Sequence, residues 1–315
     1  MKSKNNSQIH ESVDKENVSF LRNKQQQAKY LAAVILIIGA GFVIKSTFAA
    51  SRKSVRFSLS NSSTDAGVAF SAPSTSDPKP TGVAGNWTLK FSDDFNGTTL
   101  DTSKWTKNWF GDPATYSKPV NSSAGNCFSA DQISVSNGNL NMGLANNTAS
   151  GCTLRDGTTM AKYKGGLVNT LKKYEFSYGF MEARMYVPGA NGLMYNWATF
   201  WSDTTGDWPE GGEIDVMESL SDRYPNWHYH YAKNGVEAGP GGGIKMDGTG
   251  WHTYAAKWEP TKITWYYDGV EVASWTDGIV PGPHFVILEH GVNKSDTAPR
   301  PDTTAMVDYV RVWQQ

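Results

Sequence analysis

From Asn86 to the C-terminus the sequence repeats one pattern, a short run of strand-forming residues followed by a turn signal. Asn137-Gly138 is a strong hairpin dipeptide, and Pro188-Gly189 and Asp268-Gly269 end other runs. No segment carries a long apolar stripe at the 3.6-residue spacing of a helix. This pattern predicts an all-β sandwich or jelly roll. The expected strands include residues 87–91, 132–142, 174–187, 195–201, 227–231, 251–258, 262–267, 270–275, 284–288 and 306–313.

One expected strand carries three acids, Glu213, Asp215 and Glu218, between strand-forming apolar residues. Successive side chains of a strand point to opposite faces, so Glu213 and Asp215 share a face. Glu218 follows Asp215 by three positions and would point the other way in a regular strand. One extra residue, a β-bulge near 216–217, would return Glu218 to the same face.

Three carboxylates on one sheet face repel one another, so this arrangement is costly unless a site uses it. Glycoside hydrolysis requires two carboxyl groups that flank the bond to be cleaved and have tuned pKa values. The alternative is a solvated acidic face without a function.

The composition indicates a carbohydrate ligand rather than a nucleic acid. The net charge is −1, and Lys and Arg are scattered without forming a basic patch. All 12 Trp follow Asn86, and aromatic residues stand beside acids and amides. Aromatic faces stack on the C–H faces of sugars while polar groups bind the hydroxyls. We therefore expect a polysaccharide substrate, no nucleic-acid partner and a monomer.

Three regions are expected along the chain. Residues 1–50 combine a polar n-region with the apolar run 30–44, which is short for a membrane span and fits a signal-peptide core. An uncleaved signal anchor is the alternative, and it would be the chain's contact with a membrane. Residues 51–84 are rich in Ser, Thr, Pro and Gly and predict a flexible linker. Residues 85–315 form the expected catalytic domain, secreted or anchored at the cell surface.

The chain has two cysteines, Cys127 and Cys152. In an exported chain an even number favours a disulfide, and two free buried thiols are the alternative. Their spacing, with no nearby His, does not match a metal site. The loop 239–243, rich in glycine, is expected to be a flexible surface loop rather than a phosphate cradle.

Several ordered motifs resemble glycoside hydrolase family 16. The segment 213–218, Glu-Ile-Asp-Val-Met-Glu, is similar to the bulged active-site signature of its laminarinase-like endo-β-1,3-glucanases. Residues 91–105, 178–184, 251–269 and 307–313 also resemble motifs of this family, so the resemblance covers most of residues 86–315.

The resemblance implies a concanavalin-like β-jelly roll, in which two curved antiparallel sheets leave a substrate cleft on the concave face. It further implies that Glu213 is the nucleophile, Glu218 the general acid/base and Asp215 the assisting residue between them. The two carboxyl groups of a retaining enzyme lie about 5–5.5 Å apart. The reaction requires no cofactor. The position of Asp308 resembles one that helps to hold a structural calcium ion in several family members.

Five aromatic residues are further substrate-binding candidates, each weighed against a structural role. Trp208 is expected to stack on a sugar near the cleavage point, with core packing as the alternative. Trp197 and Trp201 share one strand face and either line the cleft or pack in the core. His228 and His230 share a face of the next strand, where either could bind Glu218 or a sugar.

We interpret the chain as a retaining endo-acting hydrolase of β-1,3- or mixed β-1,3/1,4-glucan. Activity on another β-linked polysaccharide such as agar or carrageenan, transglycosylation, and a non-catalytic carbohydrate-binding sandwich are the alternatives. The segment 288–293 departs from the usual family pattern and puts the identity of the sugar in doubt. Glu210, Glu289 and His290 are expected near the rim of the cleft, without an assigned role.

Overall fold

The computed structural model describes residues 78–109 and 115–315, and within these stretches strands follow one another closely. The predicted all-β class is confirmed. A 3-10 turn, η2 (Ala130–Gln132), lies between β4 (Asn126–Ser129) and β5 (Ile133–Ser136). None of the described helices has the length and apolar character needed to cross a membrane. The expected signal segment 1–50 and residues 51–77 of the expected linker lie outside the described residues.

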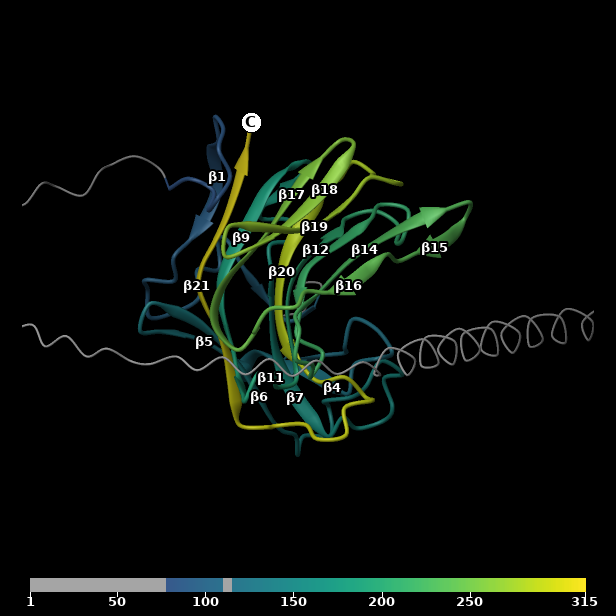
Figure 1. Ribbon diagram of the computed structural model, residues 1–315. Helices are drawn as coiled ribbons and strands as arrows, with labels where there is room; N and C mark the ends of the chain where they lie inside the picture. Colours follow the sequence, from purple (N-terminus) through teal and green to yellow (C-terminus); the bar gives the residue numbers. More distant parts are fainter. Residues whose placement is uncertain (1–77, 110–114) are drawn as a thin grey trace, which may run out of the picture. The chain divides into compact units, whose positions relative to one another are not determined.

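The acidic strand β13 lies between β12 and β14, which Figure 1 labels, in one of two sheets that we call the front sheet. Its strands pair antiparallel in the order β16, β14, β13, β12, β20 and β7, with β2 beside β7 and β8 beside β20. The bounds are β2 (Thr106–Lys107), β7 (Tyr163–Asn169), β8 (Glu175–Phe176), β12 (Trp197–Thr204), β13 (Glu213–Glu218), β14 (Asn226–Lys233), β16 (Gly241–Gly243) and β20 (His284–Gly291).

The other sheet, the back sheet, runs in the order β19, β18, β17, β9 and β21, and β21 also pairs with β1 and β6. These pairings are antiparallel, whereas β4 and β7 pair in parallel. The bounds are β1 (Thr88–Asp93), β3 (Tyr116–Ser117), β4 (Asn126–Ser129), β5 (Ile133–Ser136), β6 (Asn139–Asn146), β9 (Gly179–Val187), β10 (Gly189–Ala190), β11 (Leu193–Met194), β15 (Val236–Ala238), β17 (Gly250–Glu259), β18 (Lys262–Tyr267), β19 (Val270–Trp275) and β21 (Thr303–Gln314).

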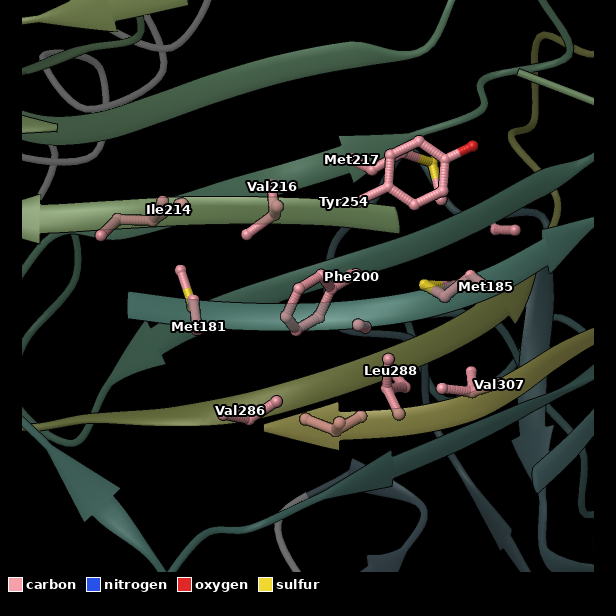
Figure 2. Close-up of a cluster of buried hydrophobic side chains, with 14 of the residues drawn as sticks. Met181, Met185, Phe200, Ile214, Val216, Met217, Tyr254, Val286, Leu288 and Val307 are labelled. Carbon is pink, nitrogen blue, oxygen red and sulfur yellow. The ribbon is translucent and has the colours of Figure 1, made fainter. Parts of the chain in front are cut away.

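The main hydrophobic core lies between the two sheets, and Figure 2 shows part of it. Alternate residues of each strand point into this core, as the period of a β-strand requires. The other side of the front sheet, which we call the open face, carries the polar residues of β12, β13 and β14. The core side chains labelled in Figure 2 are Met181, Met185, Phe200, Ile214, Val216, Met217, Tyr254, Val286, Leu288 and Val307.

The segment 78–84, which the sequence places at the end of the linker, contacts the back sheet. The backbone N–H of Thr81 donates to Oε2 of Glu182 at 2.9 Å. The indole N–H of Trp313 donates to the carbonyl of Pro78 at 2.7 Å. The packed part of the chain therefore begins before Gly85.

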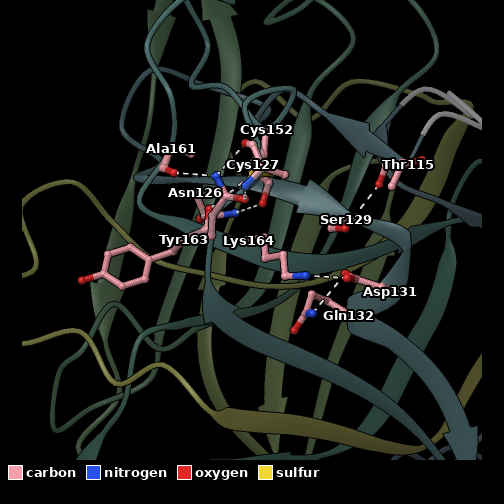
Figure 3. The surroundings of a disulfide bond; sticks show 12 residues. Thr115, Asn126, Cys127, Ser129, Asp131, Gln132, Cys152, Ala161, Tyr163 and Lys164 are labelled. Carbon is pink, nitrogen blue, oxygen red and sulfur yellow. Dashed lines mark hydrogen bonds and ion pairs between the residues drawn. A yellow bond between two sulfur atoms is a disulfide. The ribbon is translucent and has the colours of Figure 1, made fainter.

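A disulfide joins Cys127 on β4 to Cys152, with their Cα atoms 5.4 Å apart (Figure 3). Both residues are fully buried. The bond ties the loop that precedes β7 to β4, the strand that pairs in parallel with β7. Closing a loop of 25 residues removes conformational entropy from the unfolded chain, which is worth about 3 kcal/mol of stability.

Candidate active site

The predicted bulge is present in β13. Between Asp215 and Glu218 the chain advances three residues, while the facing residues of β14 advance only two, from His228 to Asn226. The pairing of β13 with β12 shifts at the same place and leaves Val216 as the extra residue. The bulge brings Glu218 to the open face with Glu213 and Asp215.

The core side of β13 explains why this strand forms despite its acids. Ile214, Val216 and Met217 are fully buried in the main core. Their burial offsets the cost of holding three carboxyl groups on the opposite face, because each buried aliphatic side chain contributes about 1.5–3 kcal/mol.

Glu218 is held from two sides. The indole N–H of Trp197 on β12 donates to its Oε1 at 2.9 Å. Nδ1 of His228 on β14 lies 2.5 Å from its Oε2. Burial lowers the pKa of His228, but the hydrogen bond and the charge of Glu218 outweigh this and raise that pKa above its usual value. Both candidates therefore lie at the site, where they contact Glu218.

Glu213 is positioned by Trp208, whose indole N–H donates to its Oε2 at 2.6 Å. Trp208 is 47% exposed, so part of its ring surface is open to a ligand. Its ring centre lies 6.0 Å from that of His230. This combination matches a residue that orients a carboxylate and stacks on a sugar.

Asp215 lies between the two glutamates. Its side chain is hydrogen-bonded to Glu213, and the charge of Glu218 also acts on it. Nε2 of His230 lies 3.4 Å from Oδ2 of Asp215, and Nδ1 of the same ring lies 2.8 Å from Oε1 of Glu237. His230 thus orients Asp215 rather than Glu218.

Burial on the open face favours the protonated forms of Glu213 and Asp215. Burial raises the pKa of Glu213 well above its usual value, and the charges of Asp215 and Asp203 add to this rise. Burial likewise raises the pKa of Asp215, with a further contribution from Glu218. A charge on one of these carboxyl groups thus favours the protonated form of its neighbour.

A glycine fixes the ring of His228. A Cβ atom built on Gly241 of β16 would lie 1.9 Å from Cδ2 of His228, so only glycine leaves space for the ring. The glycine-rich segment, expected as a flexible surface loop, instead forms the strand that pairs with β14. The segment lies at the surface as expected, but the expected loop is wrong for residues 241–243, because they pair with the backbone of β14, which no local signal reveals.

Trp201 belongs to a second hydrophobic cluster on the open face, away from the main core. Its ring stacks on that of Trp109, with centroids 5.8 Å apart and an interplanar angle of 13°. The cluster also contains Phe128, Leu167, Phe285 and Ile287. The structure thus places Trp201 on the face expected for a substrate residue, but in a packed position, 5% exposed.

Two buried acids on the open face were not assigned by the sequence. Asp203 on β12 faces Glu213, and burial raises its pKa to about 7. Glu289 on β20 lies in line with Glu218 across the sheet, and burial raises its pKa to about 8. The signal available for both was strand alternation, since Asp203 follows Trp201 by two residues and Glu289 follows Ile287 by two.

Two overlapping trios on the open face meet a geometric condition for holding a metal ion, with one ligand atom of each residue within 4.8 Å of the others. Both contain Asp215, and His228 is already hydrogen-bonded to Glu218. Asp308 belongs to neither trio, and its Oδ2 is paired with Nη1 of Arg184 at 2.8 Å. The calcium ion near Asp308 stays a prediction. The trios are Glu213, Asp215 and His230, and Asp215, Glu218 and His228.

The family model for glycosyl hydrolases family 16 matches residues 120–280, which include β13 and the strands beside it. Among curated proteins, the chain is 29% identical over 276 residues to glucan endo-1,3-beta-glucosidase A1 of Niallia circulans, covering 76% of this chain and 39% of that protein. It is 25% identical over 158 residues to endo-1,3-1,4-beta-glycanase ExsH of Rhizobium meliloti, covering 48% of this chain and 33% of that protein. The chain therefore spans well under half of each relative.

A solved structure shares the same fold. The laminarinase catalytic domain of Thermotoga maritima superposes with a TM-score of 0.56 at 21% identity, covering 73% of this chain and 99% of that one. The two-sheet jelly roll expected from the sequence is confirmed by this likeness and by the pairing of the strands.

Proposed function

The chain belongs to glycosyl hydrolases family 16, and on this premise we propose that it is an endo-acting, retaining hydrolase of β-1,3- or mixed β-1,3/1,4-glucan. The observation that carries the proposal is the bulge in β13, which brings Glu213 and Glu218 to one face with Asp215 between them. The names of its relatives, an endo-1,3-glucosidase and an endo-1,3-1,4-glycanase, support this class of substrate.

In the first step, a carboxylate oxygen of Glu213 attacks the anomeric carbon, and the bond from this carbon to the glycosidic oxygen breaks. Glu218 gives its proton to that leaving oxygen. The indole N–H of Trp208 keeps the attacking carboxylate oriented, and Trp197 and His228 fix the carboxyl group of Glu218. The product is a glycosyl ester of Glu213 and a free sugar end.

In the second step, Glu218, now ionised, takes a proton from a water molecule, and the water oxygen attacks the anomeric carbon. The ester bond to Glu213 breaks and the carboxylate returns. Two inversions give overall retention of configuration. Between turnovers Glu218 therefore carries the proton and Glu213 the negative charge, and the hydrogen bond between Asp215 and Glu213 keeps the nucleophile in place. The carboxyl groups supply this chemistry without a cofactor.

We also propose that the protein acts as a monomer outside the cytoplasm, secreted or held at the cell surface by the segment 30–44. The disulfide between Cys127 and Cys152 supports this location, because such bonds persist in oxidising compartments. A structural calcium ion near Asp308 remains part of the proposal. A lower melting temperature in the presence of a chelator would support the calcium ion. Retention of the protein by washed membranes would support anchoring at the cell surface.

The substrate is tested by incubating the full chain with laminarin, lichenan, agarose and carrageenan and measuring new reducing ends. We expect release from laminarin and lichenan, with oligosaccharides of mixed length at early times, as endo cleavage produces. Release from agarose or carrageenan alone would refute the glucan assignment. Transfer products longer than the starting oligosaccharide, with little hydrolysis, would identify a transglycosylase, and no cleavage at all would leave a carbohydrate-binding sandwich.

The roles of the two glutamates are separated by azide rescue of alanine variants. In Glu218→Ala, azide attacks the glycosyl ester on Glu213 and gives a glycosyl azide with the β configuration of the substrate. In Glu213→Ala, azide takes the place of the nucleophile and gives the α product. The unrescued variants should lose several orders of magnitude in kcat, while Glu259→Gln, a control at a half-buried position of the back sheet, retains activity. Products of the opposite configurations would exchange the two roles.

A further inference from the structure

Glu289 lies in a straight row with Glu218 across the front sheet. Thr199 on β12 faces Glu218 on one side and Glu289 of β20 on the other, and Leu167 of β7 faces Glu289. Directly paired residues of neighbouring strands point to the same face, so all four side chains lie on the open face. Two strand spacings separate Glu289 from Glu218, about 9.6 Å. Glu289 therefore lies beside β13, outside the line formed by Glu213, Asp215 and Glu218 along that strand.

Glu289 is buried to the same extent as Asp215 and Glu218. It is 5% exposed, as is Asp215, while Glu218 is 9% exposed. A ligand that reaches Asp215 and Glu218 on this face thus meets Glu289 at the same level. The segment that contains it, 288–293, is also where the sequence departs from the usual family pattern.

Two members of this row, Glu289 and Thr199, have polar side chains without a hydrogen-bond partner among the residues that the structure describes. Among residues 78–109 and 115–315, none makes a hydrogen bond or an ion pair with the Glu289 carboxyl group, on which only the charges of Glu218 and Glu213 act. Within the same part of the chain, the buried hydroxyl of Thr199 also lacks a partner. An unpaired buried polar group costs roughly 1–3 kcal/mol, and an apolar side chain like that of neighbouring Ile287 would avoid this cost.

We propose that Glu289 and Thr199 bind the hydroxyl groups of the sugar unit next to the cleavage point, so that Glu289 helps to determine which sugar is accepted there. This inference rests on the proposed function, because it requires a polysaccharide bound along the open face. It adds a specificity-determining contact at a position that takes no part in bond cleavage.

The protonation state of Glu289 defines the contact. Burial raises its pKa to about 8, and the charges of Glu218 and Glu213 on β13 contribute to the rise. The residues that face it from the other strands, Thr199 and Leu167, do not titrate. At pH 6.5 the carboxyl group is therefore neutral, donating one hydrogen bond through its O–H and accepting others through its carbonyl oxygen. Above pH 8 it loses the proton and the donor.

The test measures kcat and KM of the full chain on laminarihexaose at pH 6.5, with laminarin cleavage by the wild type as the check on the proposed function. Glu289→Leu removes both hydrogen-bonding functions and should raise KM about tenfold or more, with kcat within about threefold. Glu289→Gln keeps a neutral donor and acceptor of the same shape and should keep KM within about threefold. Thr199→Val should raise KM by a smaller factor. The matched control is Glu182→Gln, which changes a buried acid of the back sheet.

The pH dependence adds a second readout that a purely structural role would not produce. The wild-type KM should rise between pH 7 and 9 as Glu289 ionises, and KM of Glu289→Gln should stay flat over this range. An unchanged KM in Glu289→Leu overturns the inference, as does an equal rise of KM with pH in Glu289→Gln. If Glu289→Leu fails to fold, the Glu289→Gln profile decides alone. If the wild type leaves laminarin intact, the proposed function is refuted, and the inference fails with it. If the wild type cleaves laminarin but the Glu289 variants behave otherwise than expected, the inference alone is refuted.

Discussion

Gly241→Ala should weaken catalysis although it replaces no titratable residue. The new Cβ atom would lie 1.9 Å from Cδ2 and 2.5 Å from Nε2 of His228, whereas ordinary contact begins near 3.4 Å. Either the ring or the strand β16 must move by about 1.5 Å, the difference between these distances. The ring cannot move this far and keep Nδ1 at 2.5 Å from Oε2 of Glu218.

The size of the effect follows from the contact that is lost. A hydrogen bond to a charged group is worth about 1.5–3 kcal/mol. If Glu218 uses this bond throughout its proton transfers, the loss corresponds to roughly 10- to 150-fold in kcat, since 1.36 kcal/mol is one factor of ten. The melting temperature should change much less, because β16 is a short strand that pairs with only one described neighbour, β14.

The assay compares kcat on laminarin for the wild type, Gly241→Ala and the neighbouring variant Gly242→Ala. A Cβ atom on Gly242 would have its nearest contact at 3.5 Å, on Trp227, which is an ordinary distance. Gly242→Ala therefore carries the same chemical change in the same strand without the collision. Its kcat should stay within about threefold of the wild type.

Two results would refute this reasoning. If Gly241→Ala keeps the kcat of Gly242→Ala, the position of His228 does not matter for catalysis, or β16 moves aside at no cost. If both variants lose activity equally, the loss comes from stiffening the strand rather than from the ring of His228. His228→Ala should reproduce the kcat of Gly241→Ala if the lost contact is the cause.

Three further outcomes are expected. Trp208→Phe keeps an aromatic face but loses the N–H that binds Glu213. On laminarin, kcat should therefore fall about tenfold while KM changes less. An unchanged kcat would exclude the orienting role of Trp208. Reducing the Cys127 disulfide should lower the melting temperature by about 6–12 °C, because it removes about 3 kcal/mol of stability, and an unchanged melting curve under reductant would contradict this. Burial lowers the pKa of His284 and His290 to about 4, so both stay neutral in the folded protein while the unfolded chain takes up protons below about pH 6.5. Stability is therefore lost as pH falls from about 6.5 to 4, by up to about 3 kcal/mol for each residue, and thermal melts of His290→Gln should show a weaker pH dependence than those of the wild type.

Much of the fold could be predicted because strand alternation and turn chemistry are local. The bulge in β13 follows from the spacing of Asp215 and Glu218 combined with the alternation of a strand, and it needs no knowledge of the neighbours. The position of His228 and His230 on one face follows in the same way. The choice of partner did not follow, since the register places His228 opposite Asp215 and His230 opposite Glu213, and only the folded side chains show that they contact the next acid along the strand, Glu218 and Asp215.

The rest of the site depends on contacts between segments that are distant in sequence. Glu289 joins the row of Glu218 because β20 pairs with β12, and the glycine strand supports His228 because β16 pairs with β14. Trp201 packs under Trp109, which precedes it by 92 positions, and this stacking decides that its ring is covered. Sequence spacing contains no information on which strands become neighbours.

The sequence by itself determined the class of the fold, the family and the three acids of β13. Each of these depends on short stretches of sequence, in which alternation, turn residues and motif spacing act between near neighbours in the chain. The tertiary structure alone decided how those acids are charged and held. The pKa values of Glu213 and Asp215 rise through burial by the whole sheet, and the hydrogen bonds to Glu218 come from two different strands. Burial and long-range pairing exist only once the chain is folded, and they convert a row of acids into a site that can hold a proton and a charge side by side.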